Sequence, residues 1–323
     1  MTEDLKSPFV GGMGRRGFLK ESLRLGLASA FGAAALGSAG RRAFASAPDP
    51  AGGIAVVTGP DFVKDAVKAV DLLGGMGRFV PKGASVAVLA NSQSRHPGTF
   101  TSPDVLRAVI RLARDAGASR VDCVSWLNEK NWKDSGLAAV IEAEGAKLVL
   151  VPRTDENFEK VPVPKGKVLK EAWIMKEVLA HDVLIDMPIT KDHAGNKFTG
   201  TLKNLMGLNA PASNRGFHME NWETDASALE HLDRSIADLN TVVTPALCVV
   251  DATEFIITNG PFGPGEIIKP QKVVAGTDRV AIDAYCASLW GLKASDIGTI
   301  RHASGHGLGE IDLSRVRVRE ASV

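Results

Sequence analysis

From Ile54 onward, short runs of apolar residues alternate with amphipathic runs. "IAVVTG" and "ASVAVLAN" are continuous apolar runs of the length that predicts buried strands. Between them, "PDFVKDAVKAVDLLGG" repeats its apolar residues at the spacing of one helix face. "TSPDVLRAVIRLARDAGA" predicts a second helix, because Ser102 suits the N-cap and Pro103 the first helical position. The chain therefore begins as strand, helix, strand, helix.

The same alternation continues to the end of the chain. "RVDCVSW", "KLVLV", "VLIDMPI", "PALCVVDA" and "QKVVAG" predict further strands, and a last strand is expected around 316–319. Helices are expected near 135–145 and 226–239, and in "EAWIMKEVLAHD" and "DRVAIDAYCASLWG". Strands that alternate with helices predict an α/β fold, with a mainly parallel sheet and helices on both faces.

The first 45 residues predict a twin-arginine signal peptide. "GRRGFLK" starts at Gly14, a charge-free run rich in Ala and Gly covers 25–40, and small-residue cleavage sites surround Ala45. The apolar run is too short and too weakly apolar for a permanent membrane span. We expect cleavage after Ala45, a single α/β domain over 46–323, and a periplasmic location in a Gram-negative cell. The alternative for 1–45 is a buried or interfacial helix.

Charge limits the partners that the exported protein can have. The first 45 residues hold seven Lys/Arg and three Asp/Glu, so their removal changes the formal net charge from +1 to −3. That balance gives no support for nucleic-acid binding. The expected partners are the twin-arginine export machinery and a small anionic molecule.

Cysteine is scarce. Cys123, Cys248 and Cys286 share no CxxC spacing, so we expect no iron–sulfur cluster from this chain. Three buried cysteines acting as small hydrophobes are the simplest interpretation, and one disulfide remains the alternative.

The strongest chemical signal follows the strand "VLIDMPI". There the chain continues as "TKDHAGNKFTGTLKNLMG", which supplies Lys191, His193, Lys203 and the neutral donors Thr201 and Asn204. In parallel sheets, ligands bind beyond the carboxyl ends of the strands. This loop therefore predicts a site for a carboxylate or a phosphate. A metal bound through Asp192 and His193, or a solvated basic loop, are the alternatives.

Two other segments carry candidate residues. Asp251 ends the strand "PALCVVDA", where it can bind a ligand or form an Asx turn or helix cap. Asp278 is expected to cap the following helix, and Asp283 lies inside that helix among apolar residues, so it should have a partner, either Lys203 or a metal.

The remaining histidines are weaker candidates. His302 and His306 are four residues apart, as two metal ligands on one helix face would be, although Gly305, Gly307 and Gly309 favour a loop at the second one. His96, His218 and His231 are expected at the surface or in loops.

Several of these stretches resemble the domain of unknown function 362 family. The matching pieces are "AVDLLGGMGRFVPKGASVAVLAN", "TSPDVLRAVIRLARDAGASRV", "DVLIDMPITKDHAGNKFTGTLKNLMG", "VVAGTDRVAIDAYCASLWGL" and "GLGEIDLSRVRV". The resemblance implies an α/β domain, joined in some relatives to ferredoxin-like clusters, and gives no established reaction. The residues that match the family pattern by position are Lys191, His193, Lys203, Asn204, Asp278 and Asp283.

Two departures from the family pattern matter. Relatives commonly carry a lysine-proline-asparagine triplet after the second strand, where this chain has Leu89-Ala90-Asn91, so only Asn91 carries over. The chain also lacks a cluster-binding cysteine run, so electron transfer through its own iron–sulfur centre does not carry over.

Two classes of function follow from the sequence. The first is an enzyme for acid–base or metal-assisted chemistry, in which Lys191 and Lys203 hold a small anion and His193 transfers a proton. The second is a non-catalytic binding or accessory protein for a redox or metal system. The expected ligand-binding residues are Asn91, Asn204, Thr201, Asp251 and Asp283. The candidates for a divalent metal are Asp192, His193, Asp283, His302 and His306.

Overall fold

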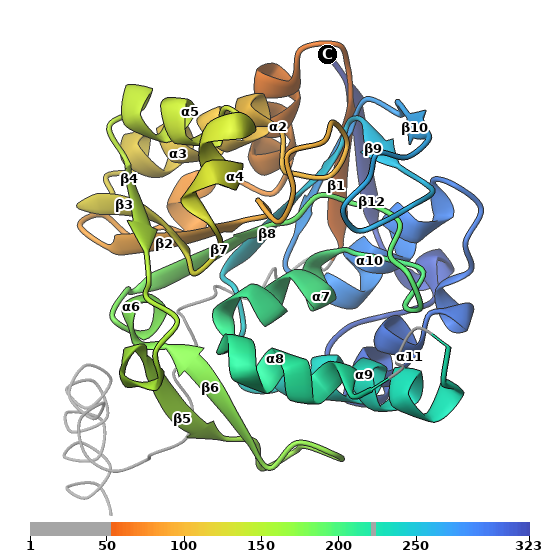
Figure 1. Cartoon of the computed structure of the whole chain (residues 1–323). Coiled ribbons are helices and arrows are strands. Elements are labelled where there is room, and N and C mark those ends of the chain that lie inside the picture. The colour runs from red at the N-terminus through yellow and green to blue at the C-terminus, as the bar shows by residue number, and fades with distance from the viewer. Residues whose placement is uncertain (1–52, 221–223) are drawn as a thin grey trace, which may run out of the picture. The chain divides into compact units, whose positions relative to one another are not determined.

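The computed structural model describes residues 53–220 and 224–323 (Figure 1). The predicted signal peptide, residues 1–45, lies outside the described residues. None of the described helices has both the length and the apolar character needed to cross a bilayer.

An eight-stranded sheet forms the centre of the domain, in the order β12-β1-β11-β8-β7-β2-β3-β4. The strands are β1 (Ile54–Thr58), β2 (Ser85–Ala90), β3 (Arg120–Ser125), β4 (Lys147–Leu150), β7 (Val183–Met187), β8 (Leu247–Ala252), β11 (Lys272–Gly276) and β12 (Val318–Ser322). The pairs from β8 to β4 are all parallel, whereas β11 is antiparallel to both of its neighbours. The predicted α/β class with a mainly parallel sheet is confirmed.

Helices cover both faces of this sheet (Figure 1). One face packs against α2 (Phe62–Leu72), α3 (Pro103–Asp115), α4 (Glu129–Asp134) and α5 (Leu137–Ala143). The other packs against α6 (Lys176–Leu179), α7 (Thr201–Asn204), α8 (Pro211–His218), α9 (Ala226–Leu239), α10 (Arg279–Ser288) and α11 (Gly298–Gly305). Successive residues of one strand enter opposite cores: Val86 and Val88 face the first layer, Ala87 and Leu89 the second. A strand that is buried on both faces must be apolar throughout, which explains the continuous apolar runs.

Smaller elements complete the fold. Two hairpins pair β5 (Phe158–Pro162) with β6 (Glu171–Met175) and β9 (Phe255–Ile256) with β10 (Ile267–Ile268). Short 3₁₀ turns are η1 (Met76–Arg78), η2 (Asp155–Asn157), η3 (Leu205–Leu208), η4 (Ala294–Asp296) and η5 (Leu313–Arg315).

One helix prediction is wrong. "EAWIMKEVLAHD" is not a single helix but strand β6 followed by the single turn α6. Ala172 and Ile174 are buried while Glu171 is exposed, and this period of two, paired along β5, prevails over the helical spacing that also fits the run.

All three cysteines are buried and free. Burial raises the pKa of each thiol, so they act as small hydrophobes, as predicted, and no disulfide joins them.

The direction of strand addition reverses between β2 and β7. From β2 the chain adds β3 and then β4 on one side, and later returns to place β7 against the other side of β2. The helices that follow β2 and β7 cover opposite faces of the sheet. At such a reversal a crevice opens beyond the carboxyl ends of the two strands, and ligands of open α/β sheets bind there.

Candidate functional site

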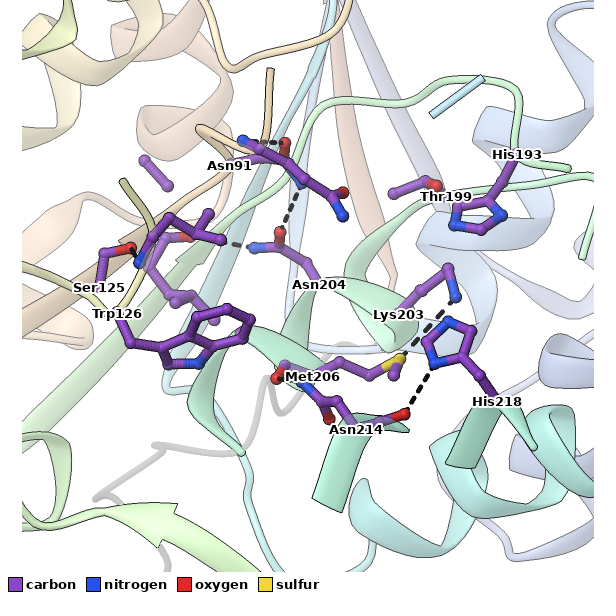
Figure 2. Close-up of a pocket in the computed structure, with 15 residues that line it drawn as sticks. Asn91, Ser125, Trp126, His193, Thr199, Lys203, Asn204, Met206, Asn214 and His218 are labelled. Carbon is purple, nitrogen blue, oxygen red and sulfur yellow. Dashed lines mark hydrogen bonds between the residues drawn. The ribbon is translucent and has the colours of Figure 1, made fainter. Parts of the chain in front are cut away.

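A cavity of about 160 Å³ lies at this reversal (Figure 2). Its walls come from the segments that follow β2, β3 and β7, and from the end of α8. The polar lining residues are Asn91, Gln93, Ser125, His193, Thr199, Lys203, Asn204, Asn214 and His218. The sheet topology therefore gathers, around one cavity, residues that lie more than a hundred positions apart in the chain.

The loop after β7 is held in shape by backbone hydrogen bonds. The amide of Thr199 donates to the carbonyl of Lys191 over 2.9 Å, and the amide of Lys191 donates back over 3.3 Å. This closed loop carries His193 toward the cavity, and α7 begins directly after it at Thr201.

Asp283 of α10 fixes the start of α7. Its carboxylate accepts hydrogen bonds from the backbone amides of Thr201, at 2.7 Å, and Leu202, at 3.0 Å. A Cβ at Gly200 would collide with this carboxylate, so the position requires glycine. Asp283 thus positions the short helix that carries Lys203 and Asn204.

The expected pairing of Asp283 with Lys203 is not what the structure shows. Burial raises the pKa of Asp283 to about 7, and its partners are backbone amides rather than an ammonium. Thr201 likewise lies outside the cavity, and its hydroxyl donates to the Arg279 carbonyl over 3.3 Å. Asp283 and Thr201, both predicted to bind the ligand, therefore stabilise α7 from outside the cavity.

Lys203 projects into the cavity without a carboxylate partner among the described residues. Its Nζ lies 3.2 Å from Asn196 Oδ1 and 3.8 Å from Met206 Sδ. The carboxylate of Asp233 is linked to Lys203 through Asn196, whose side-chain amide donates a hydrogen bond to that carboxylate. Burial lowers the pKa of Lys203 to about 8, while Asp233 opposes the fall. A buried ammonium without a counterion is costly, which suits a site whose anion comes from outside the chain.

Two histidines flank this ammonium (Figure 2). Nδ1 of His193 lies 2.7 Å from the Ala194 carbonyl, and Nδ1 of His218 lies 2.7 Å from the Asn214 carbonyl. Because a carbonyl only accepts, each Nδ1 carries the proton, and a neutral ring keeps its lone pair at Nε2. Burial, and second the charge of Lys203, lower the pKa of His193 well below its usual value. Burial lowers the pKa of His218, with the Lys203 charge acting in the same direction.

A chain of side-chain hydrogen bonds underlies the cavity. Fully buried Lys191 donates to the Thr99 carbonyl over 2.7 Å and to Asn91 Oδ1 over 3.3 Å. The amide of Asn91 donates to Asn204 Oδ1 over 3.0 Å, and the amide of Asn204 donates to Asp186 Oδ1 over 2.7 Å. Burial, and second the Lys203 charge, lower the pKa of Lys191 to about 7. An ammonium at one end and a carboxyl group at the other fix how both amides point.

Two further donors in the cavity wall have no hydrogen-bond partner among the described residues. They are the hydroxyl of Thr199, a residue that is 3% exposed, and the indole Nε1 of Trp126. A buried donor without a partner costs about 1–3 kcal/mol, so a bound acceptor would stabilise both groups.

The remaining candidate residues lie elsewhere. Asp251 accepts from the backbone amides of Ser102 and Thr253, so it holds the residue that caps α3 and closes an Asx turn. Asp278 caps α10, as predicted.

The candidate metal ligands are not brought together. Asp192 accepts from the Gly260 amide over 2.8 Å. His302 pairs with Glu230 at 2.9 Å, and His306 pairs with Asp238 at 2.7 Å.

A different group could hold a metal ion. The ligand atoms of Asp122, Glu177 and His181 all lie within 4.8 Å of one another. Asp122 is near the start of β3 and His181 just precedes β7, so this group lies at the amino edge of the sheet, opposite the cavity. The guanidinium of Arg120 already lies 3.5 Å from Asp122.

The structure thus brings Asn91, His193, Lys203 and Asn204 together from the predicted set. Trp126 was missed, although it directly follows β3 and the carboxyl-end rule would have found it. His218 was expected at the surface or in a loop, but it is the last residue of helix α8 and lines the cavity together with residues of the segment after β7. No local sequence signal marks it.

These features define an α/β protein with a polar cavity, lined in part by Lys203, at the switch point of its sheet. The chain belongs to the Domain of unknown function (DUF362) family, whose model matches residues 86–288. It is 25% identical over 235 residues to the thylakoid-associated protein sll1697 of Synechocystis sp., a match that covers 71% of this chain and 70% of that protein. Among solved structures it is similar to the lactate racemase apoprotein from Thermoanaerobacterium thermosaccharolyticum, with 16% identity and a TM-score of 0.44. That match covers 74% of this chain and 60% of the racemase chain.

Proposed function

We propose that the cavity binds a small organic anion and carries out acid–base chemistry on it. The observation that supports this proposal is the ammonium of Lys203, which lines a cavity at the switch point and has no carboxylate partner among the described residues. An anionic group of the ligand supplies the missing counterion. The hydroxyl of Thr199, which has no hydrogen-bond partner among the described residues, supplies a further hydrogen bond.

The rest of the ligand is apolar in part. Trp126, Leu127 and Met206 form a wall of the cavity, and Trp126 lies across it from Lys203 (Figure 2). A molecule with a charged end and an apolar end fits this cavity, because its charged end then contacts Lys203 and its apolar end contacts the apolar wall.

The acid–base group is His193. Its ring is neutral near pH 7, with a lone pair at Nε2, and it lies beside the ammonium that holds the anion. Such a ring can remove a proton from a ligand carbon or oxygen next to the anionic group. Lys191, Asn91 and Asn204 keep the floor of the cavity rigid through their hydrogen-bond chain.

Thermal unfolding with a panel of anions tests this proposal. Phosphate and a series of mono- and dicarboxylates are added to the wild-type protein, to Lys203→Met and to the control Lys197→Met. Lys197 is an exposed lysine of the same loop. A hydrogen bond to a charged group contributes about 1.5–3 kcal/mol, so Lys203→Met should weaken binding roughly tenfold to hundredfold. The control should bind as the wild type does. Equal responses of all three proteins would refute the proposal.

A second candidate is an accessory protein that carries a divalent metal, supported by the group Asp122, Glu177 and His181. Equilibrium dialysis against Zn²⁺ tests it. One bound ion that is lost in His181→Asn and kept in Lys203→Met would favour this role. No retained Zn²⁺ would rule it out.

We also propose export through the twin-arginine route, on the sequence of residues 1–45. Arg15→Lys combined with Arg16→Lys should leave the precursor in the cytoplasm, as cell fractionation would show. Continued export of the double variant would contradict this route.

A further inference from the structure

We propose that Lys203 is a nucleophile that forms an imine with the carbonyl carbon of a 2-oxo acid. This inference rests on the proposed function, because it takes the anion in the cavity to be the carboxylate of that acid. It adds the class of ligand and a covalent step.

The surroundings of Lys203 leave its amine available for reaction. Its contacts within the described chain are a neutral amide oxygen and a thioether, so no ion pair holds it as a cation. Because burial lowers the pKa of Lys203 to about 8, much of the amine is unprotonated at that pH. A buried lysine of this kind is the usual source of an imine with a carbonyl substrate.

Lys191 does not qualify for this role, although burial also lowers its pKa. It is 0% exposed, it does not line the cavity, and its Nζ is engaged by the Thr99 carbonyl and Asn91 Oδ1. The structure therefore assigns the reaction to one lysine of the two.

The imidazoles of His193 and His218 can move the protons that the reaction needs. A neutral Nε2 takes one proton from the Lys203 ammonium, and the free amine adds to the carbonyl carbon to form a carbinolamine. The imidazolium returns the proton to the carbinolamine oxygen, which leaves as water when the carbon–nitrogen double bond forms. The ammonium and the carbonyl compound thus become a protonated imine and one water, with no oxidant or reductant required.

A 2-oxo acid suits this cavity for a reason of charge. Its carboxylate is attached to the reacting carbon, and the protonated imine keeps the positive charge of Lys203. The carboxylate therefore remains beside a cation before and after the reaction. The hydroxyl of Thr199, which lacks a partner among the described residues, can donate to one of its oxygens.

Reductive trapping tests the inference. Wild type, Lys203→Arg and Lys197→Met are each incubated at pH 8 with glyoxylate, pyruvate, 2-oxoglutarate or phenylpyruvate and sodium cyanoborohydride. Peptide mass spectrometry then locates the reduced adducts. We expect at least one acid to modify Lys203 at a rate tenfold or more above any exposed lysine. That adduct should be absent from Lys203→Arg and unchanged in Lys197→Met.

The outcomes separate the imine from the anion site. Adducts spread evenly over exposed lysines, or none with any of the four acids, overturn the imine. If these acids or other anions still raise the melting temperature of the wild type but not of Lys203→Met, the proposed anion site stands without the covalent step. If no anion has an effect, both proposals fall. A folded Lys203→Arg, checked by circular dichroism, ensures that a missing adduct reflects the missing amine.

Discussion

The ligand-free protein should become more stable when Lys203 is replaced by methionine. Burial lowers the pKa of this lysine from 10.5 to about 8, which means that the native state disfavours its charged form. At about 1.4 kcal/mol for each pKa unit, the penalty is about 3 kcal/mol. Lys203→Met keeps most of the apolar stem and removes the charge, so at pH 7 it should raise the free energy of unfolding by up to that amount.

The gain in stability from Lys203→Met should decrease as the pH rises. Below pH 8 the lysine is charged in both the native and the unfolded states, so the wild type bears the full penalty. Between pH 8 and 10.5 the native protein loses the proton while the unfolded chain keeps it, so the wild type gains stability as pH rises. Above 10.5 the penalty is gone. The difference between variant and wild type should therefore shrink by about 1.4 kcal/mol for each pH unit in that window.

Urea denaturation at pH 7, 8, 9 and 10, followed by circular dichroism, measures this difference. Lys197→Met, at an exposed position, should show none of the pH dependence. If the free energy of unfolding of Lys203→Met at pH 7 is lower than that of the wild type by several kcal/mol, the reasoning is refuted. Such a loss would mean that Lys203 forms an ion pair with a buried carboxylate. A difference that does not vary with pH would refute it as well.

Three further results are expected. Gly200→Ala should destabilise the protein by about 1–3 kcal/mol in urea, because the new Cβ meets the Asp283 carboxylate; a neutral effect would contradict the tight packing there. Asn204→Ala should cost about 1–3 kcal/mol for each buried group that it leaves without a partner, measured in the same way, and no loss of stability would argue against the hydrogen-bond chain. Cys123, Cys248 and Cys286 should not react with a thiol reagent such as Ellman's reagent in the native protein and should all react in urea, whereas rapid native labelling would contradict their burial.

Local patterns are enough to predict most of the fold. A strand buried on both faces must be continuously apolar, so the run "ASVAVLAN" indicates a central strand by its composition alone. The cap of α3 can also be predicted from the sequence, because Ser102 is directly followed by Pro103. In the structure the Ser102 side chain accepts a hydrogen bond from the amide of Asp104. The helix prediction for the run that includes β6 is wrong because the apolar residues of this run fit the helical period as well as the strand period of two. Pairing with β5 selects the strand.

The candidate site is harder to predict, because its geometry depends on contacts between distant segments. Lys203 and His193 lie in a loop whose composition signals chemistry, so both can be chosen from the sequence. The role of Asp283 cannot be predicted from the sequence. Any buried carboxylate needs hydrogen-bond partners, and the sequence does not say whether these are side chains or backbone amides. His218 depends on where α8 ends in space, which no local pattern encodes.

The interactions that shape the cavity join very distant parts of the chain. The amide contact between Asn91 and Asn204 spans 113 residues, and the bond from Thr201 to Asp283 spans 82. Closing such long loops costs entropy that is recovered only when the whole sheet has assembled, so these contacts should form late in folding. A half-folded chain would have neither the floor of the cavity nor the orientation of α7. Ligand affinity is therefore a property of the finished protein alone, and a bound anion would report that folding is complete.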